Sequence, residues 1–168
     1  MLTQASELAV RALVVLSLES KGDPLPPRVL AEKMDCSPSY LSKVLGVLTR
    51  EGILASLRGA KGGVVLARDP EDVTLLDIVE ACDGFLVANY CRSFGPLPDR
   101  VCGFHEAMAE IHETTVDLLT RWRLSDLLAN PVSVLPDGEV GSCKMAFGGC
   151  QRFLPNASVS DDTSPPGD

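Results

Sequence analysis

Residues 37–68, SPSYLSKVLGVLTREGILASLRGAKGGVVLAR, decide the fold of this 168-residue chain. The first part predicts a helix from Ser37, because serine can cap a helix and the proline after it lacks the N–H that would stay unpaired there. Apolar residues recur at steps of three and four, which predicts a stripe facing the body: Tyr40, Leu41, Val44, Leu45 and Leu48. Short hydrogen-bonding and cationic side chains lie largely outside it: Ser39, Ser42, Lys43 and Arg50.

A second short helix is predicted upstream, over residues 27–34 (PRVLAEKM), and only Asp35 and Cys36 separate it from the capping serine. This spacing is that of a helix-turn-helix, in which the later helix enters the major groove of DNA. Taken alone, the two helices are equally compatible with an ordinary small helical domain. The residues that follow them favour the DNA-binding interpretation.

Two short apolar runs follow, residues 53–57 and 64–67, and the six residues between them are basic and rich in glycine. This pattern predicts a two-stranded hairpin, or wing, with a basic tip. Arginine and lysine would supply charge for phosphates, and glycines permit positive φ and close backbone approach. The residues expected to contact DNA are Ser39, Tyr40, Ser42, Lys43, Arg58, Lys61, Gly62 and Gly63.

The net charge of −8 is unusual for a DNA-binding protein, but the charge is unevenly distributed. Residues 1–68 hold nine Lys/Arg and six Asp/Glu, a net of +3, whereas residues 69–168 hold six and seventeen, a net of −11. We therefore expect only the first segment to face DNA. Glu7 and Arg11 interrupt the N-terminal apolar run, so we expect neither a signal peptide nor a membrane span, and a cytoplasmic protein.

The runs SPSYLSKVLGVLTREGIL, RGAKGGVVLAR and DPEDVTLLDIVEACDG closely resemble the winged-helix transcriptional regulators of the IscR, NsrR, RirA and CymR type. The resemblance covers about residues 1–129. It implies a mainly α fold: a winged helix-turn-helix domain with a two-stranded wing and a long dimerisation helix. The implied function is that of a DNA-binding transcriptional regulator, a repressor rather than an enzyme, and no nucleophile–base constellation or phosphate loop points to catalysis.

Further helices are predicted around this stretch. One runs from a cap at Thr3 to residues 21–22, and one is capped by Thr74 with Asp77 three residues on. A long helix is expected from Asp99, followed by a short one over residues 124–128. The expected organisation is a DNA-binding domain (1–84), a cofactor or sensor loop (85–100), a dimerisation helix with the final short helix (101–129), and an irregular to disordered extension (130–168).

The long helix carries an apolar residue at alternating steps of three and four: Val101, Phe104, Met108, Ile111, Thr115, Leu118 and Trp122. A narrow heptad seam usually faces one partner helix. Because a winged-helix regulator reading a two-fold DNA operator needs a two-fold interface, we interpret the seam as the homodimer contact. The alternative is a long core helix within one subunit.

Cys91, Cys102 and His105 gather where the predicted loop meets the long helix, and such ligands suit an iron–sulfur cluster or zinc. In the resembling family a cysteine trio occupies this region, with a histidine three residues after the last cysteine in some members. Here the middle cysteine is missing, its place falling near Leu97. Other members supply a carboxylate from the first helix of the partner subunit, and Glu7 holds that position. The resemblance thus implies Glu7, Cys91, Cys102 and His105 as ligands, with [2Fe–2S] favoured over [4Fe–4S].

The expected regulator senses redox, iron or nitric oxide status through a cluster at the dimer interface. The alternative is a cluster-free regulator that senses by cysteine oxidation or a partner protein. Cys36 and Cys82 are interpreted as small buried hydrophobic residues. For Cys143 and Cys150 three interpretations stay open: a disulfide switch, replacement ligands, or inert thiols. The simple interpretation of Glu7 is a favourable interaction with the helix dipole.

Overall fold

The computed structural model describes residues 2–20, 22–59, 61–84 and 102–131. The predicted sensor loop around Cys91 and nearly all of the C-terminal extension, with Cys143 and Cys150, lie outside these ranges. In chain order the elements are α1 (Gln4–Ser20), α2 (Pro27–Met34), α3 (Pro38–Arg50), β1 (Leu54–Leu57), β2 (Gly63–Leu66), the 3-10 turn η1 (Pro70–Asp72), α4 (Leu75–Asp83), α5 (Gly103–Arg121) and α6 (Leu124–Ala129).

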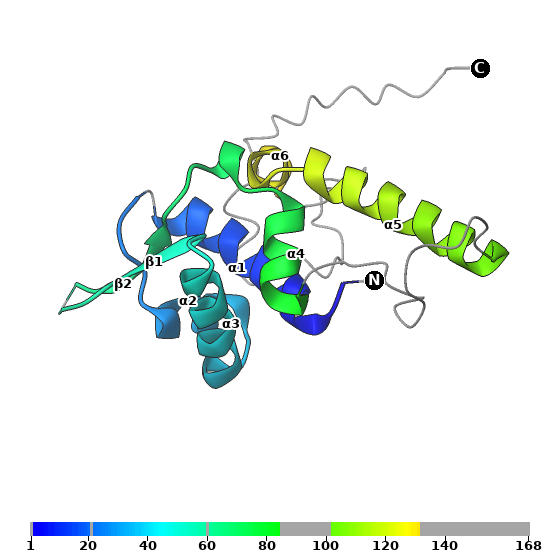
Figure 1. Cartoon of the computed structure of the whole chain (residues 1–168). Coiled ribbons are helices and arrows are strands. Elements are labelled where there is room, and N and C mark those ends of the chain that lie inside the picture. The colour runs from blue at the N-terminus through cyan, green and yellow to red at the C-terminus, as the bar shows by residue number, and fades with distance from the viewer. Residues whose placement is uncertain (1, 21, 60, 85–101, 132–168) are drawn as a thin grey trace, which may run out of the picture.

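Helix α1 is the centre of the hydrophobic core, and α2, α3, α4, α6 and β2 all pack against it (Figure 1). Almost every side chain from Leu8 to Leu16 is buried, so the apolar face is wider than the sequence stripe predicted. The one exception in this run is Arg11, whose Nη2 donates to the carbonyl of Met34 at 3.3 Å. That bond ties α1 to the end of α2.

The predicted helix-turn-helix is confirmed. Pro27 opens α2, Asp35 ends it in the left-handed region at φ 48°, and Ser37 occupies the N-cap position of α3. The expected side-chain cap is wrong, because the Ser37 hydroxyl makes no cap hydrogen bond and lies 3.1 Å from the Ser39 hydroxyl instead.

The wing is an antiparallel pair in which Leu54 faces Leu66 and Leu57 faces Gly63. A further bridge joins Leu25 to Val64, with backbone hydrogen bonds of 3.0 Å in both directions, and anchors the hairpin to the segment before α2. A Cβ at Gly63 would lie 2.5 Å from the Leu25 carbonyl carbon, so this contact requires glycine.

Helix α4 begins with the predicted capping box: Asp77 N donates to Thr74 Oγ1, and Thr74 N donates to Asp77 Oδ2, both at 3.0 Å. Gly84 ends the helix at φ 82°. The following helix begins at Gly103, so the expected start at Asp99 is wrong, since Cys102 is its extended N-cap residue.

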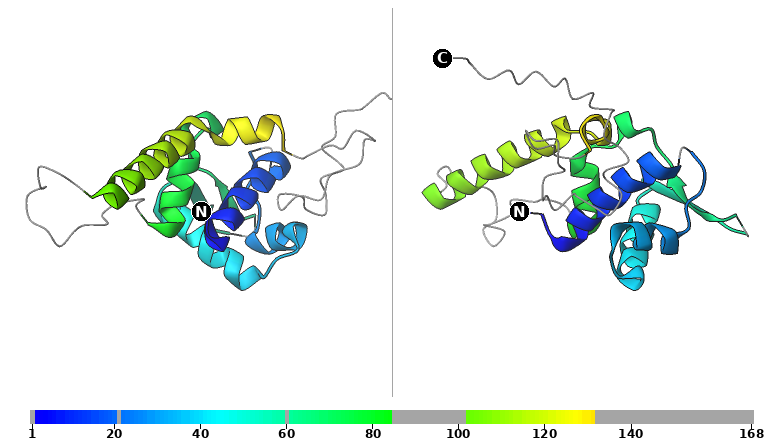
Figure 2. Two further views of the ribbon diagram at one scale, coloured as in Figure 1. Left: turned by 90° about the vertical axis from the view of Figure 1, so that its right-hand side faces the viewer. Right: turned by 180° about the vertical axis from the view of Figure 1, so that it is seen from behind.

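Helix α5 leaves the body as an arm and returns the chain to the core only at its C-terminal end (Figures 1 and 2). Its one buried residue is Leu119. There, backbone bonds of 2.8 Å run from Leu75 N to Trp122 O and from Leu124 N to Val73 O, and α6 packs beside α1. Within the described ranges, no helix is both long and apolar enough to span a bilayer.

Candidate nucleic-acid interface and metal-binding region

Helix α3 divides cleanly into a buried and an exposed face. Leu41, Val44, Leu45 and Leu48 are buried, whereas Ser39, Ser42, Lys43 and Arg50 are exposed. Tyr40, which the periodicity placed in the stripe, has 40% of its surface exposed and borders the polar face instead. The outer face therefore presents hydroxyl and cationic groups on the second helix of a helix-turn-helix.

The wing tip adds two exposed cations, Arg58 and Lys61, on either side of a turn in which Gly59 has φ 113°. Two of the glycines expected to contact DNA, Gly62 and Gly63, are also constrained by contacts within the chain. Gly62 has no positive φ, and a Cβ on it would collide with the carbonyl of Leu57. Both Gly62 and Gly63 are thus required by contacts inside the chain.

Ion pairing separates the basic residues of the helix-turn-helix and wing, residues 27–68, into two groups. Arg28, Lys33, Arg50 and Arg68 each pair with a carboxylate, at 3.1, 2.6, 3.7 and 3.3 Å respectively. Among the described residues, Lys43, Arg58 and Lys61 form no ion pair. These three cations lie on α3 and the wing tip, so their charge is free to interact with an external anion.

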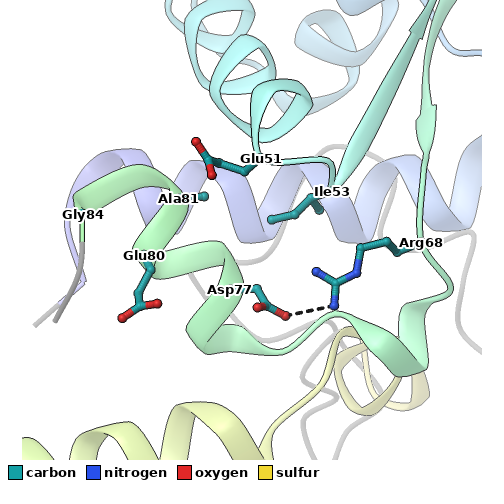
Figure 3. A pocket seen from close by; sticks show the side chains of 7 residues that line it. All are labelled: Glu51, Ile53, Arg68, Asp77, Glu80, Ala81 and Gly84. Atoms are coloured by element: carbon teal, nitrogen blue, oxygen red, sulfur yellow. Dashed lines mark hydrogen bonds and ion pairs between the residues drawn. The ribbon is translucent and has the colours of Figure 1, made fainter.

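A pocket of about 370 Å³ lies between the end of α3 and α4 (Figure 3). Three carboxylates line it, those of Glu51, Asp77 and Glu80, against the single guanidinium of Arg68, which pairs with Asp77. Its excess negative charge would repel phosphate. The pocket therefore stands apart from the cationic surface of α3 and the wing.

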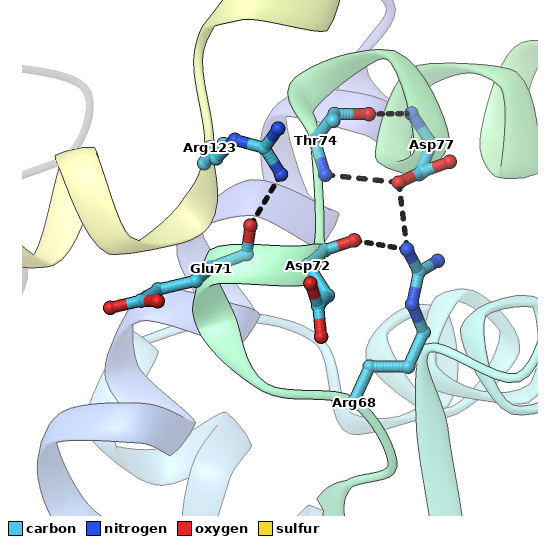
Figure 4. A network of polar contacts seen from close by, with 6 residues as sticks. All are labelled: Arg68, Glu71, Asp72, Thr74, Asp77 and Arg123. Atoms are coloured by element: carbon cyan, nitrogen blue, oxygen red, sulfur yellow. Dashed lines mark hydrogen bonds and ion pairs between the residues drawn. The ribbon is translucent and has the colours of Figure 1, made fainter.

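The same Arg68 joins the base of the wing to the start of α4 (Figure 4). Its Nη2 donates to the carbonyl of Asp72 and to Asp77 Oδ2, the oxygen that also caps α4. Arg123 donates to the carbonyl of Glu71 from the α5–α6 junction. The cap could be predicted from the sequence, but the contacts of the two arginines could not, because nothing in the local pattern reveals a partner four to 52 residues away.

The predicted seam on α5 is exposed in the single subunit. Ile111, Leu118 and Trp122 retain 56%, 46% and 43% of their surface, and Phe104 retains 63%. Exposed large apolar side chains in a row along one helix typically mark a protein interface. The alternative of a core helix within one subunit is wrong, since Leu119 is the only buried residue of α5.

Cys102 and His105 lie one turn apart at the start of α5, with the Cys102 thiol free and exposed. The His105 Nδ1 atom is buried and has no hydrogen-bond partner among the described residues. A thiol beside an unsatisfied imidazole nitrogen fits a soft metal centre. No group of three or more His, Cys, Asp or Glu side chains forms within the described part of one subunit, so Glu7 does not join this pair there.

The two cysteines of the body have properties of structural thiols. Burial raises the pKa of Cys82 to about 11, with a smaller contribution from the Asp83 carboxylate. Burial also raises the pKa of Cys36, which the nearby Arg11 guanidinium partly offsets. Both thiols therefore stay protonated at neutral pH. The two side chains pack against the hydrophobic core as small hydrophobic residues would, but they are half-buried and not fully buried as expected.

Comparison with known proteins identifies relatives over the same region. The family model Rrf2, described as "Iron-dependent Transcriptional regulator", matches residues 2–130. The HTH-type transcriptional regulator IscR of Cronobacter sakazakii is 28% identical over 131 residues, 77% of this chain and 80% of that protein.

Two solved structures illustrate the structural similarity. A putative transcriptional regulator from Listeria innocua aligns with a TM-score of 0.64 and 28% identity, covering 85% of this chain and 96% of that one. CymR, the global cysteine regulator of B. subtilis, aligns with a TM-score of 0.64 and 22% identity, covering 77% and 96%. At that identity, the likeness to CymR shows the fold alone.

Proposed function

The chain belongs to the Rrf2 family of transcriptional regulators, and we propose that it is a homodimeric repressor that binds a two-fold DNA operator through α3 and the wing. The observation that carries this proposal is the set of exposed cations without carboxylate partners, Lys43, Arg58 and Lys61, on a helix-turn-helix and its wing. Phosphate binding by unpaired Lys and Arg supplies most of the affinity for DNA, and the second helix reads base edges.

The dimer forms along α5 in this proposal. The exposed side chains of Ile111, Leu118 and Trp122 supply an apolar seam that a second copy of the helix would cover. The arm points away from the wing, so a pairing there leaves both DNA-binding surfaces accessible (Figures 1 and 2). A two-fold dimer then places two recognition helices on successive half-sites.

The sensor we propose is a [2Fe–2S] cluster held by Cys91, Cys102 and His105 of one subunit and Glu7 of its partner. The free thiol of Cys102, the unsatisfied Nδ1 of His105 and the family's iron-dependent description support this set. A bound cluster would supply one-electron redox chemistry and sensitivity to iron supply, oxidants and nitric oxide. His105 and Cys102 lie on the dimer arm, so their state would bias the spacing of the two recognition helices.

A cluster-free regulator that senses by thiol oxidation or through a partner protein is the second candidate. The missing middle cysteine near position 97 and the exposed Cys102 thiol favour it. An exposed thiol is open to oxidation. Oxidation of Cys36 and Cys82 is disfavoured, because their raised pKa lowers the fraction of reactive thiolate.

One experiment separates these candidates. The protein is purified anaerobically with iron supplied, iron and sulfide are quantified, and gel shifts compare the loaded and stripped forms on duplex DNA. Visible absorbance with stoichiometric iron and sulfide, and a different DNA affinity in the two forms, is the expected result. A colourless protein that still binds DNA would favour the cluster-free regulator, and one that binds no duplex in either form would contradict the DNA-binding role.

A further inference from the structure

Gly46 lies inside α3, where glycine is an unfavourable residue. A glycine in a helix interior loses more backbone freedom on folding than any other residue, and alanine at the same place is more stable. The helix extends from Pro38 to Arg50, so Gly46 is an interior residue one turn before the C-terminal end and has no capping role. A reason for glycine at this position must therefore come from its surroundings.

The subunit itself supplies no such reason. A Cβ built on Gly46 would meet nothing within 4 Å, and the residue has no positive φ. Gly62 and Gly63 differ in this respect, because a Cβ on either would collide with backbone of the same chain. Gly46 is exposed, so neither packing nor backbone conformation in the subunit excludes a side chain there.

The position of Gly46 on α3 suggests what excludes a side chain there. It follows Ser42 and Lys43 by four and three residues and precedes Arg50 by four, and residues at these spacings share a helix face. All three neighbours are exposed. Gly46 therefore lies in the middle of the face that presents hydroxyl and cationic groups to an external partner.

We propose that Gly46 is a contact point at which duplex DNA comes directly against the backbone of α3, so that a side chain there would hold the helix out of the groove. This inference rests on the proposed DNA-binding function and adds a specificity-determining residue to it. Lys43, which forms no ion pair among the described residues, provides the charge that draws phosphates toward this face. In this proposal the absence of a side chain at Gly46 sets how deeply α3 can enter the groove of the duplex.

The proposal predicts effects of opposite sign on stability and on binding. Gly46→Ala should raise the Tm by about 2 to 4 °C, because alanine is the better helix former and its Cβ meets only solvent. The same change should weaken binding to specific DNA by roughly tenfold, similar to the loss of one good base contact. Gly46→Leu should fold equally well and bind more weakly still.

The DNA probe is a duplex selected from a randomised library by the wild-type protein, and affinities are measured by fluorescence anisotropy at fixed salt. Thr120→Ala is the matched control, because it raises helix propensity at an exposed position of α5 that is not in the seam. The control should gain stability and keep wild-type affinity.

Two outcomes would contradict the inference in distinguishable ways. If Gly46→Ala and Gly46→Leu gain stability and bind the selected duplex as tightly as wild type, the contact at Gly46 is wrong while the DNA-binding function stands. If the wild-type protein selects no duplex from the library, the proposed function fails, and the inference fails with it.

Discussion

At the residue scale, the carboxylate partners of a basic residue decide more about phosphate binding than whether the residue is Lys or Arg. Arg28 and Arg68 are basic residues in the same half of the chain as Arg58 and Lys61, yet the first two pair with carboxylates. A paired cation has little charge left to attract phosphate, whereas an exposed unpaired one keeps it. This difference selects which arginine of the wing to test, since Arg58 lies at the tip of the hairpin and Arg68 at its base.

Arg58→Ala and Lys61→Ala should weaken DNA binding in different ways. Arginine at the wing suits a narrow minor groove, so we expect Arg58→Ala to cost about 1 to 3 kcal/mol with the selected duplex. Lys61→Ala should lower affinity for all sequences and reduce the salt dependence by about one phosphate contact. Arg28→Ala is the control, because Arg28 pairs with Glu32. Unchanged binding in both wing variants would contradict a DNA-binding wing.

The thiols should react in an order set by exposure and pKa. With its pKa raised by burial to about 11 from 9.0, Cys82 has roughly a hundredth of the ordinary thiolate fraction at pH 8. In iron-free protein at pH 8, iodoacetamide followed by peptide mapping should label Cys102 rapidly and Cys82 slowly, with urea-unfolded protein as the control. Rapid labelling of Cys82 in the folded protein would contradict its burial.

The raised pKa of Cys82 also predicts a pH dependence of the unfolding free energy. The unfolded chain ionises Cys82 near pH 9, before the folded chain does, so this thiol favours folding below pH 9, and its contribution is lost as the pH rises toward 11. Cys82→Ala should therefore flatten the decline of the unfolding free energy over that interval. The measurement is urea denaturation at pH 8, 9, 10 and 11.

At the element scale, α5 is a helix whose exposed seam predicts assembly. Ile111→Glu should turn the dimer into a monomer, because a carboxylate would be buried without a partner in the interface, while the 56% exposure of Ile111 in one subunit leaves the fold intact. Light scattering measures the change, with Thr120→Glu, exposed and outside the seam, as the control. A variant that stays dimeric would show that the seam is not the interface.

The cap of α4 is the second element with a measurable role. Asp77→Ala removes the carboxylate that accepts from the Thr74 backbone N–H and pairs with Arg68, so we expect a loss of about 1 to 2 kcal/mol in unfolding free energy. Most of that loss belongs to the cap, because the ion pair is more than a third exposed and is screened. Urea denaturation tests it against Glu32→Ala, which removes only an exposed helix pair. A loss no larger than in that control would contradict the cap's role.

Elements with local signals could be predicted from the sequence, and contacts between distant residues could not. Pro27 and Met34 bound a helix where periodicity placed it, and the cap of α4 followed from Thr74 and Asp77. The start of α5 was placed four residues early, because a heptad pattern does not fix where the backbone turns extended. The bridge between Leu25 and Val64, which fixes the wing, left no signal in either segment.

At the scale of the whole molecule, the charge asymmetry and the geometry agree. The wing projects from one end of the body and α5 from the other (Figures 1 and 2). The net charge of +3 belongs to residues 1–68, which include α3 and the wing, and the net charge of −11 to the remainder, so we expect DNA to approach from the side of α3 and the wing. A dimer joined along α5 would keep this polarity in both copies.

The proposed ligand set makes a prediction that only a dimer can satisfy. Cys102 and His105 of one subunit would be completed by Glu7 of its partner, so Glu7→Ala and Cys102→Ala should each lose the visible absorbance of the cluster. Mixing the two variants should restore part of it, because a heterodimer has one site that keeps all its ligands and one that has lost two. With random exchange half of the dimers are mixed, so about a quarter of the wild-type absorbance should return.

The control for this mixing experiment combines both changes in one chain and mixes that double variant with Glu7→Ala. Every site in such dimers lacks the Glu7 carboxylate, so no absorbance should return. Recovery in the first mixture and not in the second would place the carboxylate across the subunit interface. If neither mixture recovers while each variant remains dimeric by light scattering, Glu7 is not a ligand supplied by the partner, and the proposed ligand set is wrong.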